Sequence, residues 1–240
     1  MGRLRGTKNT GRHWRSPSIG AAVMYFCLTV AGATHAGTIH TDGRVVPRNE
    51  WRLAVGPAAG GLVFDQDLAD FRWDTRPAVQ SGLRATVYRG RLATGIRILR
   101  THTTQASGIP GETRVPQVNL TAVDILGQAR VMRFGGAELW GSAHGGRLHL
   151  GYDPDKLAFD PGGGSGVITV DFKPISVWDF GFGLEVRGEL RRNIALSLHG
   201  EGSTFALDTA HRLGNEIVLS RERFYNWSLR LQFSWLLKLG

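Results

Sequence analysis

Cysteine is almost absent from this 240-residue chain. The single cysteine, Cys27, lies in an apolar stretch near the start of the chain, Ile19–Ala33. Basic residues precede that stretch and small residues follow it, an order typical of a secretory signal peptide. We therefore expect residues 1–36 to be a signal peptide that is cleaved after Ala33 or Ala36. The mature chain would then contain neither a disulfide nor a reactive thiol.

A strong excess of charge is also missing. The formal net charge is +9, and removing the five cations of the expected signal peptide leaves +4, scattered along the chain. Proteins that bind nucleic acid usually concentrate their basic residues on one face or in one segment. The sequence therefore predicts no nucleic-acid partner.

Long apolar runs and helical periodicity are missing after residue 36. No segment approaches the 18 or so continuous apolar residues of a transmembrane helix. Apolar and polar residues alternate instead: in 177–191 the even positions are apolar, and in 224–240 the odd positions are apolar. A period of two is typical of a strand with one apolar and one polar face.

Connection lengths indicate how these strands are arranged. Long and short connections alternate along the chain, as in transmembrane barrels with short periplasmic turns and long extracellular loops. The sequence therefore predicts an all-β, single antiparallel transmembrane β-barrel of eight strands over residues 50–240, after a short periplasmic segment at 37–49. Ten strands is the alternative, because 166–174 is a further candidate strand; 206–224 is expected to be a long loop. The eight segments are 50–56, 78–88, 92–99, 118–131, 137–152, 177–191, 193–203 and 224–240.

Aromatic residues favour a membrane barrel over a soluble barrel with an apolar interior. They gather near strand ends, where membrane barrels carry interfacial girdles. A soluble edge strand with two tryptophans and a phenylalanine would also invite aggregation. The predicted interface aromatics are Trp51, Trp140, Tyr152, Trp178, Trp227 and Trp235.

The end of the chain carries a motif, Leu231-x-Phe233-x-Trp235, which is similar to the terminal signal read by the outer-membrane insertion machinery. It departs from the usual pattern because residues 236–240 follow it. In architecture the chain resembles the small eight-stranded outer-membrane barrels, such as the OmpA transmembrane domain and OmpW-type proteins. This resemblance implies the outer membrane of a Gram-negative bacterium and contact with its lipid and lipopolysaccharide. Loop arginines that suit lipopolysaccharide phosphates are Arg212, Arg221 and Arg223.

One hairpin places residues with possible chemistry inside the barrel. With a tight turn centred on Arg192, Glu185 faces His199 and Arg187 faces Ser197. Ser197, His199 and Glu185 are the residue types of a nucleophile, a base and an orienting acid. Lipid A deacylases have a serine and a histidine two apart on one strand, but in the opposite order. We instead expect a charged network that fills the lumen, formed by Glu185, Arg187, Glu189, His199, Glu201 and Arg230.

Other motifs predict no cofactor and no metal. His144 and His149 flank a glycine pair but have no further partner at metal-ligand spacing. The Gly-rich segment 162–166 lacks the strand-to-helix context and the lysine of a phosphate-binding loop.

Three function classes remain open. The first is a non-enzymatic surface barrel that acts as a scaffold, an adhesion platform for a protein partner or a narrow conduit. The second is a lipid-modifying outer-membrane hydrolase of the lipid A deacylase type. The third is a soluble periplasmic binder of the lipocalin type.

Overall fold

The computed structural model describes residues 50–64, 77–105, 116–159, 167–213 and 216–239. The expected signal peptide and the expected segment at 37–49 lie outside these ranges. In the part of the chain that is described, no helix is long and apolar enough to cross a membrane.

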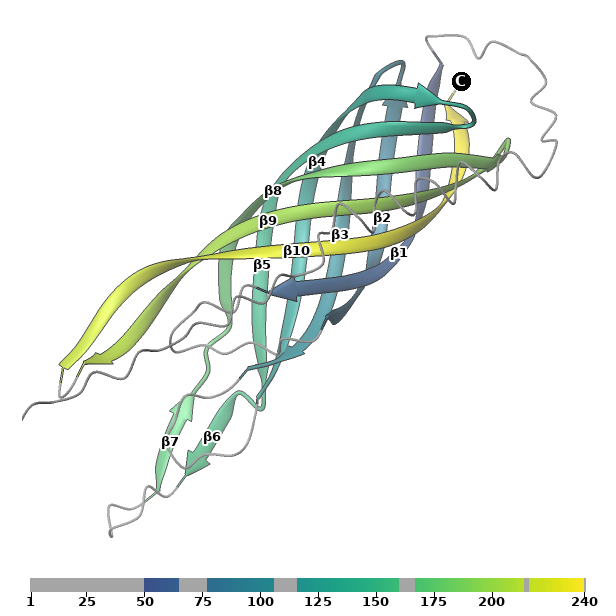
Figure 1. Cartoon of the computed structure of the whole chain (residues 1–240). Helices are drawn as coiled ribbons and strands as arrows, with labels where there is room; N and C mark the ends of the chain where they lie inside the picture. The colour runs from purple at the N-terminus through teal and green to yellow at the C-terminus, as the bar shows by residue number, and fades with distance from the viewer. Residues whose placement is uncertain (1–49, 65–76, 106–115, 160–166, 214–215, 240) are drawn as a thin grey trace, which may run out of the picture. The chain divides into compact units, whose positions relative to one another are not determined.

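Eight long strands close into one antiparallel barrel (Figure 1). Their order around the barrel is β1-β10-β9-β8-β5-β4-β3-β2. The prediction of eight strands is therefore confirmed. The candidate strand at 166–174 exists as β7, but it pairs only with β6 in a separate hairpin between β5 and β8. The strands are β1 (Trp51–Phe64), β2 (Ala78–Arg89), β3 (Leu92–Thr104), β4 (Gln117–Phe134), β5 (Ala137–Asp153), β6 (Lys156–Phe159), β7 (Ile168–Asp171), β8 (Ile175–Arg191), β9 (Ile194–Leu213) and β10 (Glu216–Leu239).

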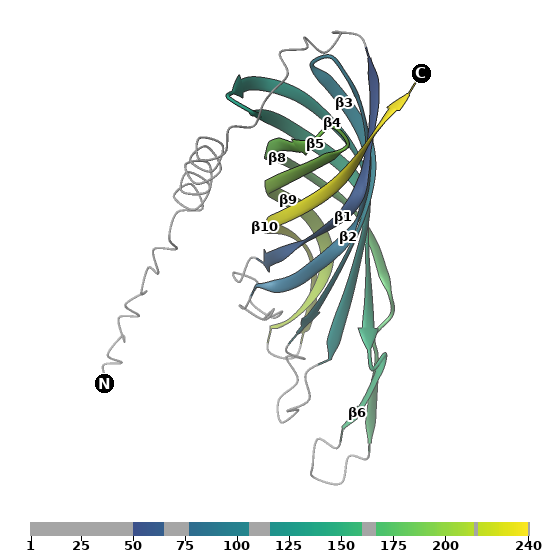
Figure 2. The same cartoon turned by 90° about the vertical axis from the view of Figure 1, so that its right-hand side faces the viewer.

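The two ends of the barrel differ. At one end, called here the turn end, two-residue turns join β2 to β3, β4 to β5 and β8 to β9. Gly90 and Gly135 adopt positive φ angles of 62° and 57° in two of these turns, a conformation that favours glycine. Trp51 pairs with Leu239, so β1 begins and β10 ends at the turn end (Figure 2). The opposite end is called the ribbon end.

The β8–β9 hairpin has the predicted register. Glu185 lies opposite His199, and Arg187 lies opposite Ser197. The turn occupies Arg192 and the following residue. The register shifts by one residue at a β-bulge between residues 189 and 191, next to the turn. The pairs farther from the turn than this bulge keep the predicted register.

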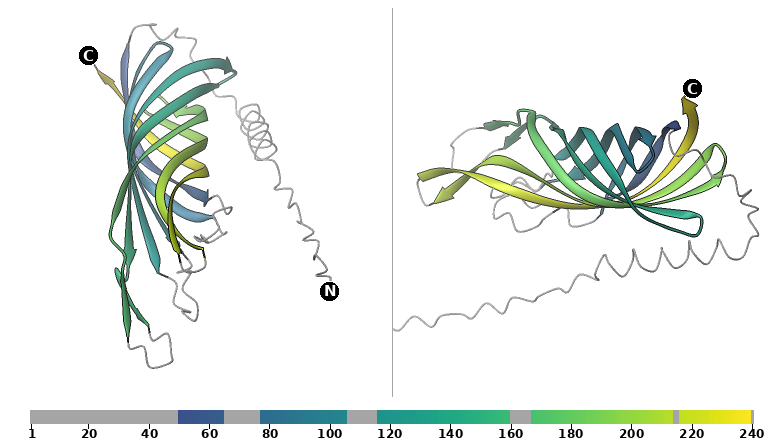
Figure 3. Two further views of the ribbon diagram at one scale, coloured as in Figure 1. Left: turned by 90° about the vertical axis from the view of Figure 1, so that its left-hand side faces the viewer. Right: turned by 90° about the horizontal axis from the view of Figure 1, so that it is seen from above.

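The segment 206–224, predicted as a loop, is instead a strand extension. β9 continues to Leu213, and β10 begins at Glu216. Pairing of β8 with β9 stops at Phe205, and pairing of β1 with β10 stops at Asn226. The two strands then continue paired only with each other for roughly 25 Å. This two-stranded ribbon diverges from the neighbouring strands β1 and β8 (Figures 1 and 3).

The reason for this difference is a switch in which face is apolar. Within the barrel, β9 and β10 direct polar side chains inward, whereas towards the ribbon end Phe205 and Phe224 are buried and stack 5.0 Å apart. The apolar residues therefore move from the outward to the inward positions of β9 and β10 at this level. Because the alternation is interrupted there, the sequence did not show that both strands continue. Arg221 and Arg223 lie exposed on the ribbon, not in a loop; Arg212 also lies in the strand extension.

The outer surface of the barrel is apolar. Phe182 and Trp178 on β8 are 76% and 57% exposed, whereas Asp179, Glu185 and Arg187 on the other face of the same strand are buried. Exposed apolar residues of β2, β3, β4 and β10 continue this surface around the barrel. An apolar belt around a polar lumen is the arrangement of a transmembrane barrel and the reverse of a lipocalin. The soluble alternative needed the opposite arrangement.

Four predicted interface aromatics lie on this outer surface, namely Trp51, Trp178, Trp227 and Trp235. Trp140 was placed wrongly, because it is fully buried in the lumen, where it packs edge-on against Tyr88 at 5.3 Å. Tyr152 is also not on the outer belt, since it packs against a buried apolar cluster at the ribbon end and stacks on Phe172. The outward positions of β5 include the small residues Gly141, Ala143 and Gly145. Most large apolar residues of β5 therefore lie on its inward face, whereas the sequence pattern placed them on the outer face.

Two apolar layers close the lumen above and below its charged middle. The turn-end layer contains Leu236, the one apolar residue that interrupts the polar face of β10, together with Ala54, Tyr88, Ala93, Trp140 and Ala195. The ribbon-end layer is larger and comprises Leu62, Phe64, Ala78, Leu99, Val118, Leu120, Ala122, Leu148, Leu150, Phe205, Leu207 and Phe224.

Candidate functional site in the barrel lumen

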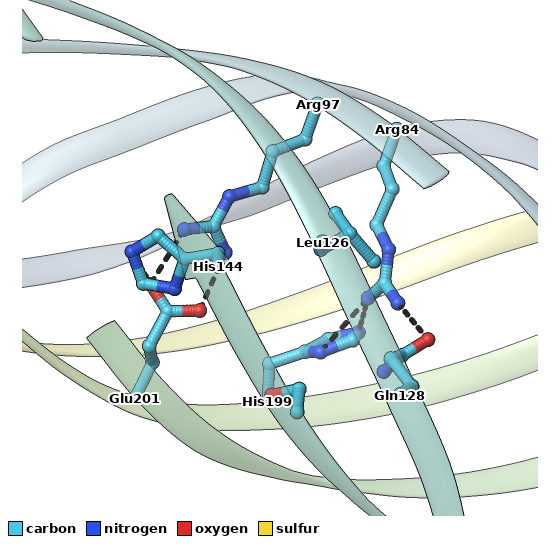
Figure 4. Close-up of a pocket in the computed structure, with 8 residues that line it drawn as sticks. Arg84, Arg97, Leu126, Gln128, His144, His199 and Glu201 are labelled. Atoms are coloured by element: carbon cyan, nitrogen blue, oxygen red, sulfur yellow. Dashed lines mark hydrogen bonds and ion pairs between the residues drawn. The ribbon is translucent and has the colours of Figure 1, made fainter. Parts of the chain in front are cut away.

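The middle of the lumen is filled by charged and amide side chains from opposite walls. Arg97 of β3 reaches across to Glu201 of β9 (Figure 4). Arg84 of β2 reaches across to Glu185 of β8 in the same way. All four side chains are at most 8% exposed. Such groups are stable in a lumen only if each one has partners, because a buried unpaired charge is costly.

Arg84 is the centre of one half of this network. Its guanidinium donates to Gln128 Oε1 at 2.5 Å, to Glu185 Oε2 at 3.1 Å and to Gln232 Oε1 at 3.2 Å. Gln128 in turn donates to the same Glu185 oxygen at 2.6 Å. Four strands are therefore linked through one arginine, since its planar fork can serve several acceptors at once.

Arg97 is the centre of the other half. It binds both carboxylate oxygens of Glu201, at 2.5 and 2.8 Å, and its Nε donates to Asp124 Oδ2 at 2.8 Å. Arg230 donates to Glu201 at 2.8 Å and to Gln80 at 2.8 Å. Bidentate arginine–carboxylate pairs are among the stronger hydrogen-bonded pairs in proteins.

The predicted network members do not all lie in this layer. Four of them lie in the charged middle of the lumen, namely Glu185, His199, Glu201 and Arg230. Glu189 lies nearer the turn end, where its half-exposed side chain pairs with Arg52 at 3.1 Å.

Arg187 is buried but forms no ion pair among the described residues. Its guanidinium lies 4.1 Å from the ring centre of Tyr88, and so makes a cation–π contact. Arg187, an expected member of the network, is therefore buried in the lumen but contacts an aromatic ring instead of a carboxylate. Tyr88, which belongs to the turn-end apolar layer, occupies the space beside it.

The prediction missed the partners from the first half of the chain, Arg84, Arg97, Asp124 and Gln128. A signal was available: Arg84 shares its parity with buried Tyr88, and Arg97 shares its parity with buried Leu99. The alternation was weak there because inward glycines and alanines interrupt it.

The candidate catalytic set does not form a nucleophile–base pair. Glu185 and His199 lie close, with 3.6 Å between Oε2 and Nδ1. However, Arg84 Nη1 lies 3.0 Å from Nε2 and 3.1 Å from Nδ1 of His199. No hydrogen bond joins Ser197 to His199. A histidine that faces a guanidinium cannot readily accept a proton from a serine, because the resulting imidazolium would be repelled.

The predicted insertion motif lies on the outer face of β10. Leu231 and Trp235 are about half exposed, and Phe233 packs edge-on against Trp235 at 5.2 Å. β10 does not end at this motif but continues to Leu239. The residues that depart from the usual pattern are therefore part of the barrel wall.

The histidine pair considered for a metal is separated by the wall. His144 points into the lumen and is buried, whereas His149 is exposed on the opposite face of β5.

No protein-family model matches the chain, and no curated protein matches it either. The matching solved structures include the outer membrane protein AlkL in lipid bilayers, with 15% identity over 80% of this chain and 92% of that chain, and a TM-score of 0.47. The fold of the chain is a closed eight-stranded antiparallel barrel with an apolar outer belt and a polar lumen. Neisserial surface protein A matches with 9% identity over 76% and 95% of the two chains (TM-score 0.46), and Escherichia coli outer membrane protein W with 12% over 78% and 97% (TM-score 0.46). The predicted resemblance is confirmed at the level of architecture, and no residue role follows from it.

Proposed function

We propose that this protein is a non-enzymatic outer-membrane barrel with a closed lumen, which displays the β9–β10 ribbon at the cell surface as a binding platform. The observation that carries the proposal is the ribbon itself. β10 has 24 residues, whereas a transmembrane β-strand needs about 9–11. A paired extension of this length is not needed to close the barrel and is available to a partner.

Two exposed arginines of the ribbon suit an anionic partner, although the ribbon as a whole carries as many acids as arginines. Arg221 and Arg223 are exposed there, and the contact of Arg221 with Asp208 is long, at 4.0 Å between two largely exposed side chains. A pair of this kind contributes little energy and leaves the guanidinium available. Lipopolysaccharide phosphates are the anions closest to such a surface, and a protein with an acidic patch is the alternative.

Insertion into the outer membrane is part of the same proposal. The outward row of the last strand contains exposed Leu231 and Trp235 and the partly buried Phe233 between them, where the insertion machinery would meet it. The apolar belt supplies the lipid contact.

Surface display is tested by epitope insertion. We expect an epitope placed between Leu213 and Glu216 to bind antibody on intact Gram-negative cells. The same epitope placed after Arg192, at the turn end, should bind only after the outer membrane is permeabilised. Heat-modifiable gel mobility checks that both variants fold. The opposite staining pattern would mean that the orientation of the barrel is the reverse of the proposed one. Equal staining of both epitopes on intact cells would contradict the proposal that the ribbon is displayed at the cell surface.

A closed lumen is tested by conductance. The purified barrel in a planar bilayer is expected to show no steady ion conductance, because the charged middle is paired and an apolar layer lies on each side of it. An eight-stranded barrel is just wide enough to be filled by its own side chains. A general porin measured in the same bilayer is the positive control. Steady, reproducible channel openings from the purified protein would support the narrow-conduit alternative instead.

A further inference from the structure

Three neighbouring strands direct a histidine and two carboxylates to one point in the lumen. Asp124 of β4 pairs with Gly146 of β5, and Gly146 pairs with Asp179 of β8. The two acids therefore lie in one row, with a glycine between them. A Cβ atom at Gly146 would collide with the carboxylate of Asp124. The missing side chain creates the space in which the two carboxylates converge.

His144 enters the same space from the next row of β5. It pairs with Gly181, and a Cβ atom at Gly181 would collide with the His144 ring. One potential ligand atom from each of Asp124, His144 and Asp179 lies within 4.8 Å of the other two. All three side chains are buried.

The polar atoms of this cluster are not satisfied by the protein. Neither ring nitrogen of His144 has a hydrogen-bond partner, and the same holds for Oδ1 of Asp124 and Oδ1 of Asp179. His144 Nε2 lies 3.6 Å from Asp179 Oδ2 and 3.6 Å from Glu201 Oε1, which is too far for a hydrogen bond. Buried polar atoms are rarely left without partners, so several of them around one point indicate a missing group.

The charge around this point favours a cation. Within the described residues, Asp179 has no arginine partner, and its one ion-pair contact is with His144. Arg97 and Arg230 are the guanidinium partners of Asp124 and Glu201, so together with Asp179 there are three carboxylates for two guanidinium groups. The neighbouring half of the network, around Arg84 and Glu185, has no such excess of acid. The deficit of positive charge is therefore local to the unsatisfied atoms.

We propose that Asp124, His144 and Asp179 bind one divalent transition-metal ion, with Zn²⁺ as the representative ion. Tetrahedral zinc holds nitrogen and oxygen ligands at about 2.0–2.1 Å, which places neighbouring ligand atoms about 3.4 Å apart. The separation of 3.6 Å between His144 and Asp179 already matches this value. Asp124 needs only a small movement, because its Oδ1 is free while Oδ2 stays with Arg97.

We expect a water molecule as the fourth ligand. A cavity of about 10 Å³ lies next to His144 and Glu201, although Asp124 and Asp179 do not line it (Figure 4). This is room for about one water. The bound ion would connect β4, β5 and β8 from inside. Spacing along the chain did not reveal the site, because its three ligands come from three strands and lie far apart in sequence.

Metal binding is tested on the tag-free, full mature protein in detergent, with Zn²⁺ and Co²⁺ as probes. We expect one equivalent of Zn²⁺ by elemental analysis after dialysis, and visible Co²⁺ absorption bands of a four-coordinate site that Zn²⁺ abolishes. His144→Gln and Asp179→Asn should each weaken binding by at least about 100-fold, since even second-shell changes cost 10–100-fold. His149→Gln is the matched control, on the same strand but exposed outside, and should bind as the unaltered protein does.

The outcomes separate a metal site from a structural ion pair. If the unaltered protein takes up neither ion, or if His144→Gln and His149→Gln bind Zn²⁺ equally, the cluster is a hydrogen-bonding element and the proposal is wrong. Heat-modifiable gel mobility shows which variants fold. If His144→Gln does not fold, the comparison of Asp179→Asn with the unaltered protein still tests metal binding. None of these results depends on the ribbon, so the proposed platform is judged separately.

Discussion

Replacing Arg97 with alanine in the metal-free protein is expected to lower the free energy of unfolding by about 3–5 kcal/mol, because the substitution leaves the buried carboxylate of Asp124 unpaired and removes the bidentate partner of Glu201. Arg97 is the bidentate partner of Glu201 and the only arginine partner of Asp124 among the described residues. Arg230 would still pair with Glu201, but Asp124 would keep no cation. Urea unfolding in lipid vesicles, followed by tryptophan fluorescence, measures the loss.

Ser197→Ala is the control for this prediction. Ser197 lies in the same lumen and is as buried as Arg97, but no ion pair depends on it. Its substitution should change the free energy of unfolding by less than about 1 kcal/mol and leave the acyl pattern of lipid A unchanged. If Arg97→Ala is silent while Ser197→Ala alters the lipid, the charged layer is not structural and the hydrolase alternative is correct.

Parity alone was sufficient to predict the faces of the strongly alternating strands. In β8, large apolar residues alternate with acids and arginines, so only one assignment keeps Phe182 and Glu185 in suitable surroundings. The same parity, with the short turn at Arg192, determines which residues of β8 and β9 face each other. Local rules set this register, because a two-residue turn leaves little freedom.

Parity fails where the lumen itself is apolar. Trp140 and Leu236 point inward because the barrel is closed near its turn end by a layer of apolar side chains. A sequence pattern shows which residues share a face, but it does not show which solvent that face meets. The same ambiguity hid the ribbon, since Phe205 and Phe224 are apolar and inward at the ribbon end.

The contacts across the lumen could not be predicted at all from sequence. Arg84 and Glu185 are 101 residues apart and stand on opposite walls. Whether they meet depends on the stagger of all the strands between them, which tilts each row of the barrel. The cluster of Asp124, His144 and Asp179 depends in addition on glycines that leave space beside it.

The proposed contact of the outer belt with lipid gives the second large expected effect. Phe182→Arg is expected to destabilise the barrel in lipid vesicles by about 2–4 kcal/mol, the cost of a cation near the membrane midplane on the outside of a barrel. Phe182 lies midway along β8 and is 76% exposed, so arginine at this position cannot reach the polar lumen. Unfolding in vesicles and the yield of heat-modifiable protein from cells report the effect.

Leu92→Arg is the matched control, because Leu92 is 65% exposed on the same outer surface but is the first residue of β3, at the turn end. An arginine near the membrane interface costs only about 0–1 kcal/mol. A large loss of unfolding free energy for Phe182→Arg and a small loss for Leu92→Arg would show that the membrane midplane lies near the middle of β8, away from the turn end. Equal, negligible losses at both positions would mean that water and not lipid surrounds the belt, and the membrane assignment would then be wrong.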